Sequence, residues 1–275
     1  MNRKKIFGLL ILVLVLAGLL AVPVMADSHI TEDEVTGHSR GNHRLDCYIA
    51  LPWGSDGPDQ PQYPVIVWAN GWGGNNVAGA TQTDWYKPML QQWALDGPFI
   101  VIAANAWSAR EDDVLKCLQW IADQNEVGGR YEGLVDLTKI GLAGHSQGAG
   151  AVVKAGDGEP NGFEITTVVA MNPYGPSWVS ADDQDGPIMV LTGLYDSVTP
   201  YSWTYPVFEA QQENGNDGIY AVHQEAGHSN LNLYQEVVAL WWQFQLNGIS
   251  SAEDDMKDIL NAYPWETQYT GSLAD

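Results

Sequence analysis

Positive charge is scarce in this sequence. Its 275 residues contain 12 Lys and Arg against 34 Asp and Glu, which gives a formal net charge of −22. Nucleic acids and anionic membrane surfaces are bound through cationic patches, so we expect neither as a partner. Strong negative charge keeps an exported protein soluble, and it also suits high salt, where screening weakens self-repulsion. An ordinary acidic secreted protein and one from a saline habitat are both consistent with this composition.

Cysteine is nearly absent, because Cys47 and Cys117 are the only two. One falls in an expected strand and the other in an expected helix, and their spacing does not say whether they lie within bonding range. A disulfide and two buried thiols are both open. Neither Cys stands at metal-site spacing, no H-E-x-x-H motif occurs, and His29, His38 and His43 have no carboxylate or Cys at ligand spacing. We therefore expect no metal and no cofactor.

A long apolar run occurs only at the N-terminus. Residues 2–5 are positively charged, residues 6–22 are almost entirely apolar, and Val24-Met25-Ala26 has the small residues of a cleavage site. We expect residues 1–26 to be a signal peptide that is removed after Ala26, and the protein to be secreted to the extracellular space. The alternative is an uncleaved membrane anchor, since the apolar run approaches spanning length. Cleavage leaves about 250 residues, which is enough for a single domain over residues 27–275.

Beyond the leader, short apolar runs alternate with segments of helical periodicity. This alternation predicts the α/β class, with a mostly parallel central sheet flanked by helices on both faces. We expect an edge strand before residue 43, a last strand at 218–223, a closing helix at 231–246, and then a polar tail after about residue 248 with a short helix followed by disorder. The other expected strands are 44–51, 63–69, 98–104, 139–143, 165–171 and 187–193, and the other expected helices are 83–95, 108–123 and 149–155.

The motif Gly144-His145-Ser146-Gln147-Gly148 lies between an expected strand and an expected helix. It has the form G-x-S-x-G, which in this context is typical of a nucleophile elbow. A strained turn lifts the Ser hydroxyl above the sheet edge, and the flanking glycines allow the strand and the helix to pass closely. The helix start behind Ser146 also offers unpaired N–H groups to a developing oxyanion. We therefore expect Ser146 to be a nucleophile.

Two further residues follow expected strands in the order that this chemistry requires. Asp196 comes after the strand at 187–193, and His228 comes after the strand at 218–223. We expect His228 to take the proton of the Ser146 hydroxyl, and Asp196 to orient the imidazole. Asp196 as an ordinary turn residue and His223 as an alternative base are the competing interpretations. His145, which adjoins the nucleophile, is expected to point away from it and to serve packing.

A Gly-rich loop, Asn70-Gly71-Trp72-Gly73-Gly74, directly follows the buried strand at 63–69. Sites of α/β proteins lie at the carboxyl ends of such strands. We expect the backbone N–H of Trp72, together with that of Gln147, to hold the oxyanion. A plain surface turn is the alternative for this loop.

Five stretches of the chain together resemble the secreted cutinase-like α/β-hydrolases, the branch that includes polyester (PET) hydrolases and is related to dienelactone hydrolases and chlorophyllases. The matching stretches are 65–72, 141–150, 171–174, 193–200 and 226–229. The resemblance implies the α/β-hydrolase fold without a large lid, and Ser146, Asp196 and His228 as the catalytic residues of a single catalytic domain over 27–275.

The same resemblance implies that Trp72, Gln147 and Tyr174 bind substrate. In that family the position of Tyr174 is commonly Trp, and the position of Gln147 is often Met. Both replacements preserve a binding role but leave plastic degradation open. The disulfide that many relatives place near the Asp and His loops is absent, because neither Cys lies there.

The expectation is a secreted, monomeric serine carboxylic-ester hydrolase that acts on hydrophobic esters, with polyesters as a further substrate class. A small-ester carboxylesterase or lipase without polymer activity is one alternative. A non-catalytic α/β-hydrolase-fold binding protein, using its aromatic loops to hold a glycan or a surface, is the other.

Overall fold

A computed structural model of the chain describes residues 29–35, 45–51, 61–72, 85–106, 108–156, 162–175 and 186–274, with the backbone alone for 29–35, 45–48 and 105. Several expected features lie outside the described residues. They are the signal peptide, the end of the Gly-rich loop at Gly73 and Gly74, and His38 and His43. Among the described residues, no helix is long and apolar enough to span a bilayer.

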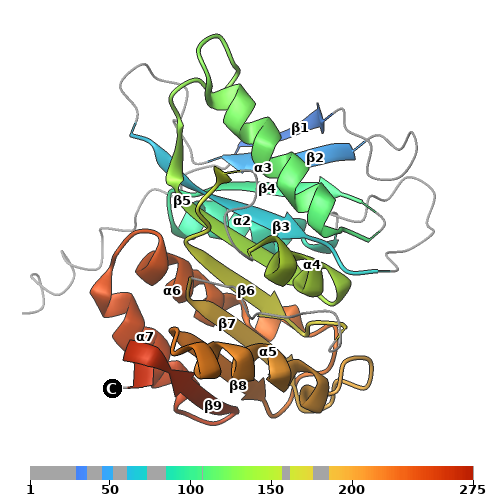
Figure 1. Ribbon diagram of the computed structural model, residues 1–275, viewed down its shortest axis with the longest axis vertical. Helices are drawn as coiled ribbons and strands as arrows, with labels where there is room; N and C mark the ends of the chain where they lie inside the picture. The colour runs from blue at the N-terminus through green and yellow to red at the C-terminus, as the bar shows by residue number, and fades with distance from the viewer. Residues whose placement is uncertain are drawn as a thin grey trace, which may run out of the picture.

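The described strands form one nine-stranded sheet in the order β1-β2-β4-β3-β5-β6-β7-β8-β9 (Figure 1). Strands β3 to β8 run parallel to one another, whereas β1, β2 and β9 pair antiparallel at the two ends of the sheet. The predicted, mostly parallel sheet is therefore confirmed. The strands are β1 (His29–Val35), β2 (Leu45–Leu51), β3 (Tyr63–Ala69), β4 (Ile100–Asn105), β5 (Val135–His145), β6 (Thr167–Met171), β7 (Ile188–Gly193), β8 (Gly218–His223) and β9 (Trp265–Thr270).

Helices cover both faces of the sheet, as predicted, and they divide the core into two layers. They are α2 (Lys87–Asp96), α3 (Glu111–Asn125), α4 (Gln147–Ala155), α5 (Tyr201–Asn214), α6 (Gln235–Gln245) and α7 (Ser250–Leu260). Buried residues of α3, α4 and α5 share one cluster with Val67 of β3, and those of α2, α6 and α7 share the other with its neighbour Trp68. Successive side chains of a strand point to opposite faces. A strand covered on both faces is therefore apolar throughout, as the sequence of β3 is.

The C-terminal segment corrects the sequence-based expectation. The strand at 218–223 is not the last, because β9 pairs antiparallel with it, with Trp265 opposite His223. The expected short helix is present as α7, which buries Met256 and Leu260, but the expected disorder after it is wrong. The burial of β9 alternates, as an edge strand with one covered face requires.

Three smaller differences concern where elements begin. Strand β5 starts at Val135 rather than 139, because Val135 and Asp136 pair with the first residues of β3. Helix α2 starts at Lys87, with a proline in its first turn. The expected closing helix consists of a 3-10 turn, Leu231–Leu233, followed by α6. Cys117 is fully buried in the core under α3, whereas the side chain of Cys47 lies outside the described part of the chain.

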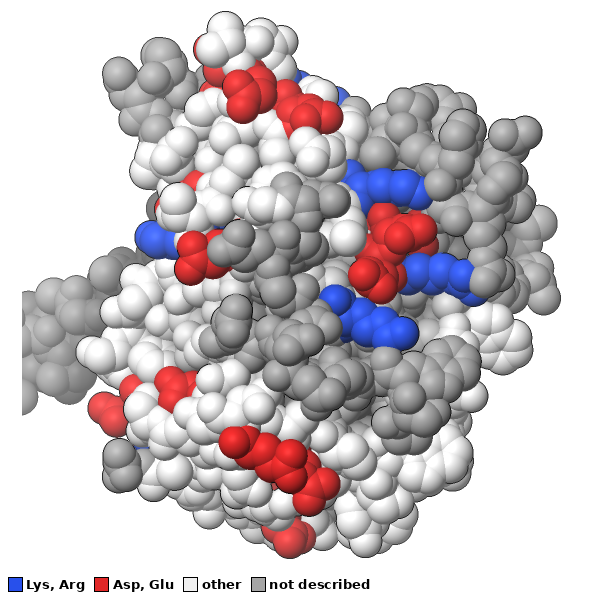
Figure 2. Space-filling model, viewed as in Figure 1, with Lys and Arg blue, Asp and Glu red and all other residues white. Residues whose placement is uncertain are grey.

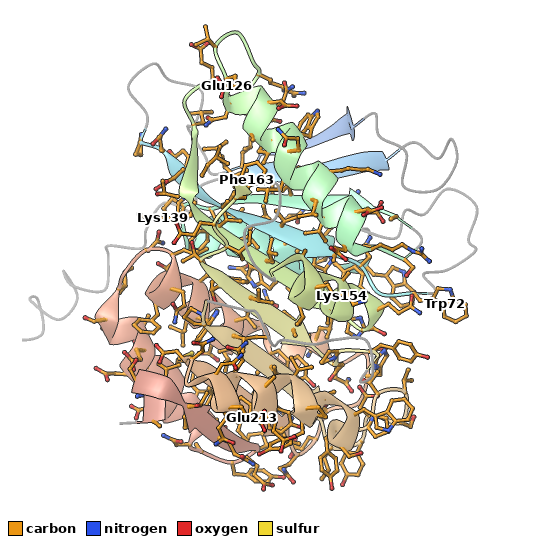
Figure 3. All side chains as sticks on the ribbon, viewed as in Figure 1. Trp72, Glu126, Lys139, Lys154, Phe163 and Glu213 are labelled. Atoms are coloured by element: carbon orange, nitrogen blue, oxygen red, sulfur yellow. The ribbon has the colours of Figure 1, made fainter. Side chains whose placement is uncertain are left out.

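The carboxyl ends of the parallel strands meet at one edge of the sheet. Register pairs His145 of β5 with Met171 of β6, and Gly193 of β7 with His223 of β8. The segments that follow these strands therefore lie along the same edge. Trp72, which follows β3, projects from the molecule at this edge (Figure 3).

Candidate active site

Ser146 occupies a strained turn between β5 and α4. Its backbone has φ 56° and ψ −120°, outside the regions that side chains other than Gly ordinarily adopt. The turn is fixed on both sides, because the Ser146 N–H donates to the Met171 carbonyl at 3.0 Å and the Tyr174 N–H donates to the Ser146 carbonyl at 3.0 Å. Only 6% of the residue is exposed.

The flanking glycines are required by close backbone contacts. A Cβ on Gly148 would lie 2.1 Å from the carbonyl oxygen of Ala69, and one on Gly144 would lie 2.4 Å from the carbonyl oxygen of Gly148. Both are steric clashes with backbone atoms, which cannot rotate away. The glycine spacing of the motif is thus what allows α4 to start directly against β3 and β5.

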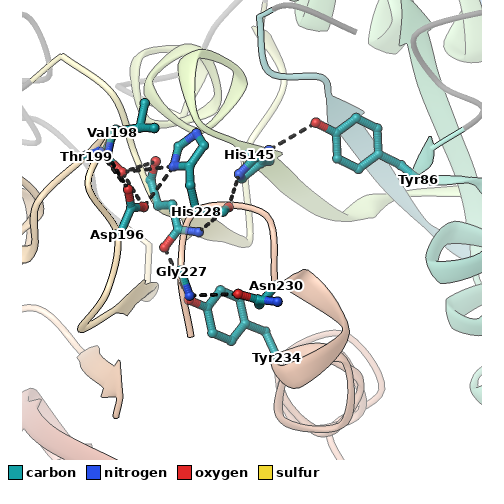
Figure 4. Close-up of polar contacts among 10 residues, drawn as sticks. Tyr86, His145, Asp196, Val198, Thr199, Gly227, His228, Asn230 and Tyr234 are labelled. Carbon is teal, nitrogen blue, oxygen red and sulfur yellow. Dashed lines mark hydrogen bonds and ion pairs between the residues drawn. The ribbon is translucent and has the colours of Figure 1, made fainter. Parts of the chain in front are cut away.

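Asp196 and His228 form a hydrogen-bonded pair at the same edge (Figure 4). The Nδ1 of His228 lies 2.8 Å from Oδ2 of Asp196, whose side chain is fully buried. The carboxylate also accepts the N–H groups of Val198 and Thr199 and the hydroxyl of Thr199, at 2.7–2.8 Å. Burial by itself would raise the pKa of Asp196, but the hydrogen bonds from His228 and Thr199 outweigh it and hold the pKa below its ordinary value. Asp196 is therefore an anion that orients the imidazole.

Two of the three expected catalytic residues, Asp196 and His228, are hydrogen-bonded to each other in the structure, but Ser146 is not hydrogen-bonded to His228. Among the described residues, no hydrogen bond connects the Ser146 hydroxyl with His228. The three lie on segments that end at one sheet edge, and the ring of His228 is 4.7 Å from the ring of His145, the residue before Ser146. Catalytic hydrogen bonds are often long in unliganded sites and tighten when substrate binds.

The expected oxyanion donors lie beside Ser146. A Cβ on Gly71 would be 3.0 Å from Cβ of Ser146, so the loop after β3 lies against the nucleophile. Gln147 is the first residue of α4, where the backbone N–H has no partner within the helix. In the described part of the chain, the N–H groups of Trp72 and Gln147 donate to no acceptor. Both are available to a negative charge that develops on a carbonyl oxygen beside the Ser146 hydroxyl.

The expected substrate-binding side chains differ in their surroundings. Trp72 is 68% exposed and Tyr174 is 38% exposed, so both offer aromatic faces to solvent at the edge of the site. The side-chain oxygen of Gln147 instead accepts the hydroxyl of Ser108, from the loop between β4 and α3. Its side chain is thereby directed toward that loop.

His145 takes part in the site in a way that sequence reasoning missed. Its Nε2 lies 2.8 Å from the backbone oxygen of His228, and its Nδ1 lies 3.0 Å from the hydroxyl of Tyr86. A carbonyl oxygen only accepts, so Nε2 carries the proton and Tyr86 donates to Nδ1. Burial, followed by the nearby charge of His228, lowers the pKa of His145 to about 3, which keeps the ring neutral.

Asn172 belongs to the matching stretch 171–174, but the sequence alone assigns it no role. It follows β6 with φ 47°, in the left-handed region that Asn tolerates better than most residues. Its Nδ2 donates to the His228 carbonyl at 2.8 Å, and its Oδ1 accepts the hydroxyl of Tyr234 at 3.2 Å. Its position directly after an apolar strand and before Pro173 is a further sequence signal.

His223, the alternative base, lies elsewhere. Its ring packs edge-on against Trp265 at 4.7 Å, and its Nδ1 accepts the backbone N–H of Glu225 at 3.2 Å. Within the described residues it forms no hydrogen bond with Ser146 or Asp196. Packing between β8 and β9 accounts for it.

The described residues contain no group of three or more His, Cys, Asp or Glu side chains that could hold a metal ion. A scan against protein-family models and a search of curated proteins both found no match for this chain.

Proposed function

We propose that this chain is a secreted serine esterase that hydrolyses carboxylic esters through Ser146, His228 and Asp196. The observation that carries the proposal is the strained Ser146 turn at the sheet edge that also holds the Asp196–His228 pair. A serine held in a strained strand-to-helix turn, followed along the chain by an Asp and a His, is the arrangement of the α/β-hydrolases. That fold is part of the proposal.

The tautomer of His228 allows this residue to act as the base. Because Nδ1 donates its proton to Asp196, Nε2 has a free lone pair. In the proposed reaction, Nε2 takes the Ser146 proton while Oγ forms a bond to the ester carbonyl carbon. The carbonyl electrons move onto the oxygen, where the N–H groups of Trp72 and Gln147 stabilise the negative charge.

Collapse of this intermediate breaks the bond to the alcohol, which leaves with the proton from His228. Water then attacks the acyl group on Ser146 in the same way and releases the acid. The protein supplies no further reactant. Removing one oxyanion donor is expected to cost roughly 3–4 kcal/mol of transition-state stabilisation.

The surroundings of the site favour an apolar ester. Trp72, Tyr174 and Tyr195 are exposed beside Ser146 and Asp196, and the exposed apolar residues Leu194 and Val198 flank Asp196 in the chain. Aromatic rings bind apolar chains with little loss of side-chain entropy. We propose hydrophobic esters as the substrate class and a polyester as an additional substrate.

Hydrolysis of p-nitrophenyl butyrate by the wild type and by Ser146→Ala tests the catalytic proposal. We expect turnover by the wild type and a loss of about 10⁴-fold or more in the variant. A folded wild type that does not turn over this ester would contradict the proposal, and the non-catalytic binding protein would then be the better account.

Amorphous PET film tests the polymer substrate separately. Release of aromatic monomers by the wild type, but not by Ser146→Ala, supports a polyester substrate. Turnover of the soluble ester without any release from film would restrict the activity to small esters.

A further inference from the structure

The backbone of His228 is attached to the immediate neighbours of Ser146. Its carbonyl oxygen accepts Nε2–H of His145, the residue that precedes Ser146, and Nδ2–H of Asn172, both at 2.8 Å. Asn172 directly follows Met171, whose own carbonyl accepts the Ser146 N–H. Since the described residues contain no direct hydrogen bond between Ser146 and His228, these contacts set the distance between the nucleophile and the base.

The same hydrogen bonds continue to the oxyanion loop, which we define as Gly71 and Trp72. A Cβ on Gly71 would lie 3.2 Å from Nδ1 of His145, so this loop packs directly against the His145 ring. The hydroxyl of Tyr86 lies 3.0 Å from the same Nδ1, and the Gly71 N–H lowers the pKa of Tyr86, as a donor to its hydroxyl oxygen does. The direction is uniform, because Tyr86 donates to His145 and His145 donates to His228 (Figure 4), and the Gly71 N–H points the same way, toward the oxygen of Tyr86. Each group donates the single proton that it carries.

Both side chains in the middle of this hydrogen-bond chain stay neutral near neutral pH. Burial raises the pKa of Tyr86 to about 12, against a smaller lowering by the Gly71 N–H. Burial lowers the pKa of His145, and the charge of the neighbouring His228 adds to that effect. The direction of the hydrogen bonds is thus fixed whether His228 is neutral or charged.

We propose that Tyr86 and His145 are positioning residues that couple the oxyanion loop to the backbone of His228, and so hold the oxyanion donor and the base together around Ser146. The inference rests on the proposed esterase function. The Gly71 N–H is committed to Tyr86, which leaves the next N–H, that of Trp72, to the oxyanion. Tyr86 comes from the turn before α2, so a residue outside every motif of the site determines the geometry of two of its parts.

The substitution Tyr86→Phe tests the proposal, because it removes one oxygen and both of its hydrogen bonds while keeping the ring that packs at 4.9 Å from Trp68. The matched control is Tyr220→Phe, which removes a buried hydroxyl that donates to the Tyr201 carbonyl at 2.8 Å, lies 3.0 Å from the Thr204 hydroxyl, and forms no hydrogen bond with Ser146, Asp196 or His228 among the described residues. For p-nitrophenyl butyrate we expect Tyr86→Phe to lower kcat about tenfold with KM changed less than about twofold. Tyr220→Phe is expected to stay within about twofold of the wild type.

The melting temperatures of the two variants are measured alongside, since both lose a buried hydroxyl. If both variants lose the same stability and only Tyr86→Phe loses kcat, the result supports a positioning role for Tyr86. Wild-type kcat in a folded Tyr86→Phe would overturn the proposal, and so would an equal loss of kcat in both variants.

The tautomer of His145 can be measured in the wild-type protein. This measurement depends neither on the folding of Tyr86→Phe or Tyr220→Phe nor on enzymatic turnover. Long-range ¹H–¹⁵N spectra of the wild type, with His145 assigned by His145→Gln, should show a neutral ring protonated at Nε2 from about pH 5 to about pH 8. A ring protonated at Nδ1, or at both nitrogens, would overturn the hydrogen-bond chain. An inactive wild type would remove the proposed esterase function, and this spectrum would still decide whether the chain of hydrogen bonds exists.

Discussion

Two non-glycine residues in the described part of the chain have positive φ, and both lie at the site: Ser146 at 56° and Asn172 at 47°. Such conformations cost on the order of 1–3 kcal/mol each and persist only where the surroundings fix them. Both residues are fixed by hydrogen bonds to β6, β7 or the segment after β8. The conformation of Asn172 places its side chain against the His228 backbone, whose carbonyl oxygen accepts its Nδ2–H.

Substituting Asp196→Asn tests the orientation of His228. The amide oxygen of Asn can still accept the N–H groups of Val198 and Thr199, but the side chain no longer specifies which imidazole nitrogen is protonated, so we expect kcat to fall on the order of 10⁴-fold without unfolding. Kinetics on p-nitrophenyl butyrate together with thermal melting provide the measurement. The control is Asp217→Asn, which alters a carboxylate that likewise accepts a backbone N–H and a hydroxyl, both from Ser272. Equal effects of the two variants on kcat would be inconsistent with the assigned role.

His145 makes stability depend on pH in a defined direction. Its folded-state pKa of about 3 lies below the ordinary value of 6.5. On acidification, the imidazole of His145 therefore becomes protonated in the unfolded chain while it stays neutral in the folded protein. Stability is therefore lost as pH falls below 6.5, by about 3 kcal/mol between pH 7 and pH 4.5. The lowered pKa of Asp196 acts only at lower pH, below its ordinary value of 3.8.

Urea unfolding at several pH values measures this dependence. His145→Gln has no ionisable group at that position and should lose clearly less stability over the same interval, relative to its own value at pH 7. His223, whose burial also lowers its pKa, contributes equally to both proteins. Parallel curves for the wild type and the variant would rule out the proposed environment of His145.

At the scale of elements, the start of α4 is placed by contact with β3. The substitution Gly148→Ala puts a Cβ 2.1 Å from the Ala69 carbonyl oxygen, which forces the helix away from the strand. A displacement of about 1 Å of the Gln147 N–H can cost about 100-fold in rate, so we expect kcat to fall by about that much, with a loss of about 3 kcal/mol of stability. Gly128→Ala, at φ 82° with open space around it, should leave kcat unchanged. A fully active Gly148→Ala would show that the contact with β3 is not needed.

Most strands could be predicted because they are buried on both faces. The bounds of β3 and β8 agree with their apolar runs, since continuous apolar sequence is what a two-sided core requires. Strand β9 could not be predicted in this way. Its sequence, WETQYT, is largely polar because one face is exposed, and only pairing with β8 makes it a strand.

The candidate site could be predicted in part for a similar reason. Ser146, Asp196 and His228 each follow an apolar run, and local sequence carries that signal. Tyr86 and Asn172 act through hydrogen bonds to residues 59 and 56 positions away, and no local pattern encodes such contacts. The hydrogen bonds of Thr199 with Asp196 could be predicted from the local sequence, because an Asp followed three residues later by Thr favours a turn closed by side-chain hydrogen bonds.

At the scale of the whole molecule, charge is the dominant feature. Acidic side chains are spread in separate groups over the face seen in Figure 2, while basic ones gather mainly in one area. With a net charge of −22, self-repulsion destabilises the compact state at low salt.

We expect 0.5 M NaCl to raise the melting temperature by about 5 °C over 10 mM NaCl, which corresponds to about 2 kcal/mol of screened repulsion. Calorimetry at pH 7 is the measurement, and the control is the same salt step near the isoelectric point of about 4.3, where little net repulsion is left to screen. An unchanged or lower melting temperature at pH 7 would refute the importance of net charge.

The whole molecule also determines whether the site exists, because its parts follow β3, β5, β6, β7 and β8 and meet only through the register of the sheet. We expect this assembly to make the Ser146 hydroxyl a nucleophile. Reaction with a fluorophosphonate, followed by mass spectrometry of peptides, tests this directly. We predict one adduct per chain, located on Ser146 and lost in His228→Ala. No adduct on the folded protein, or an adduct on another serine, would show that Ser146 is not the nucleophile.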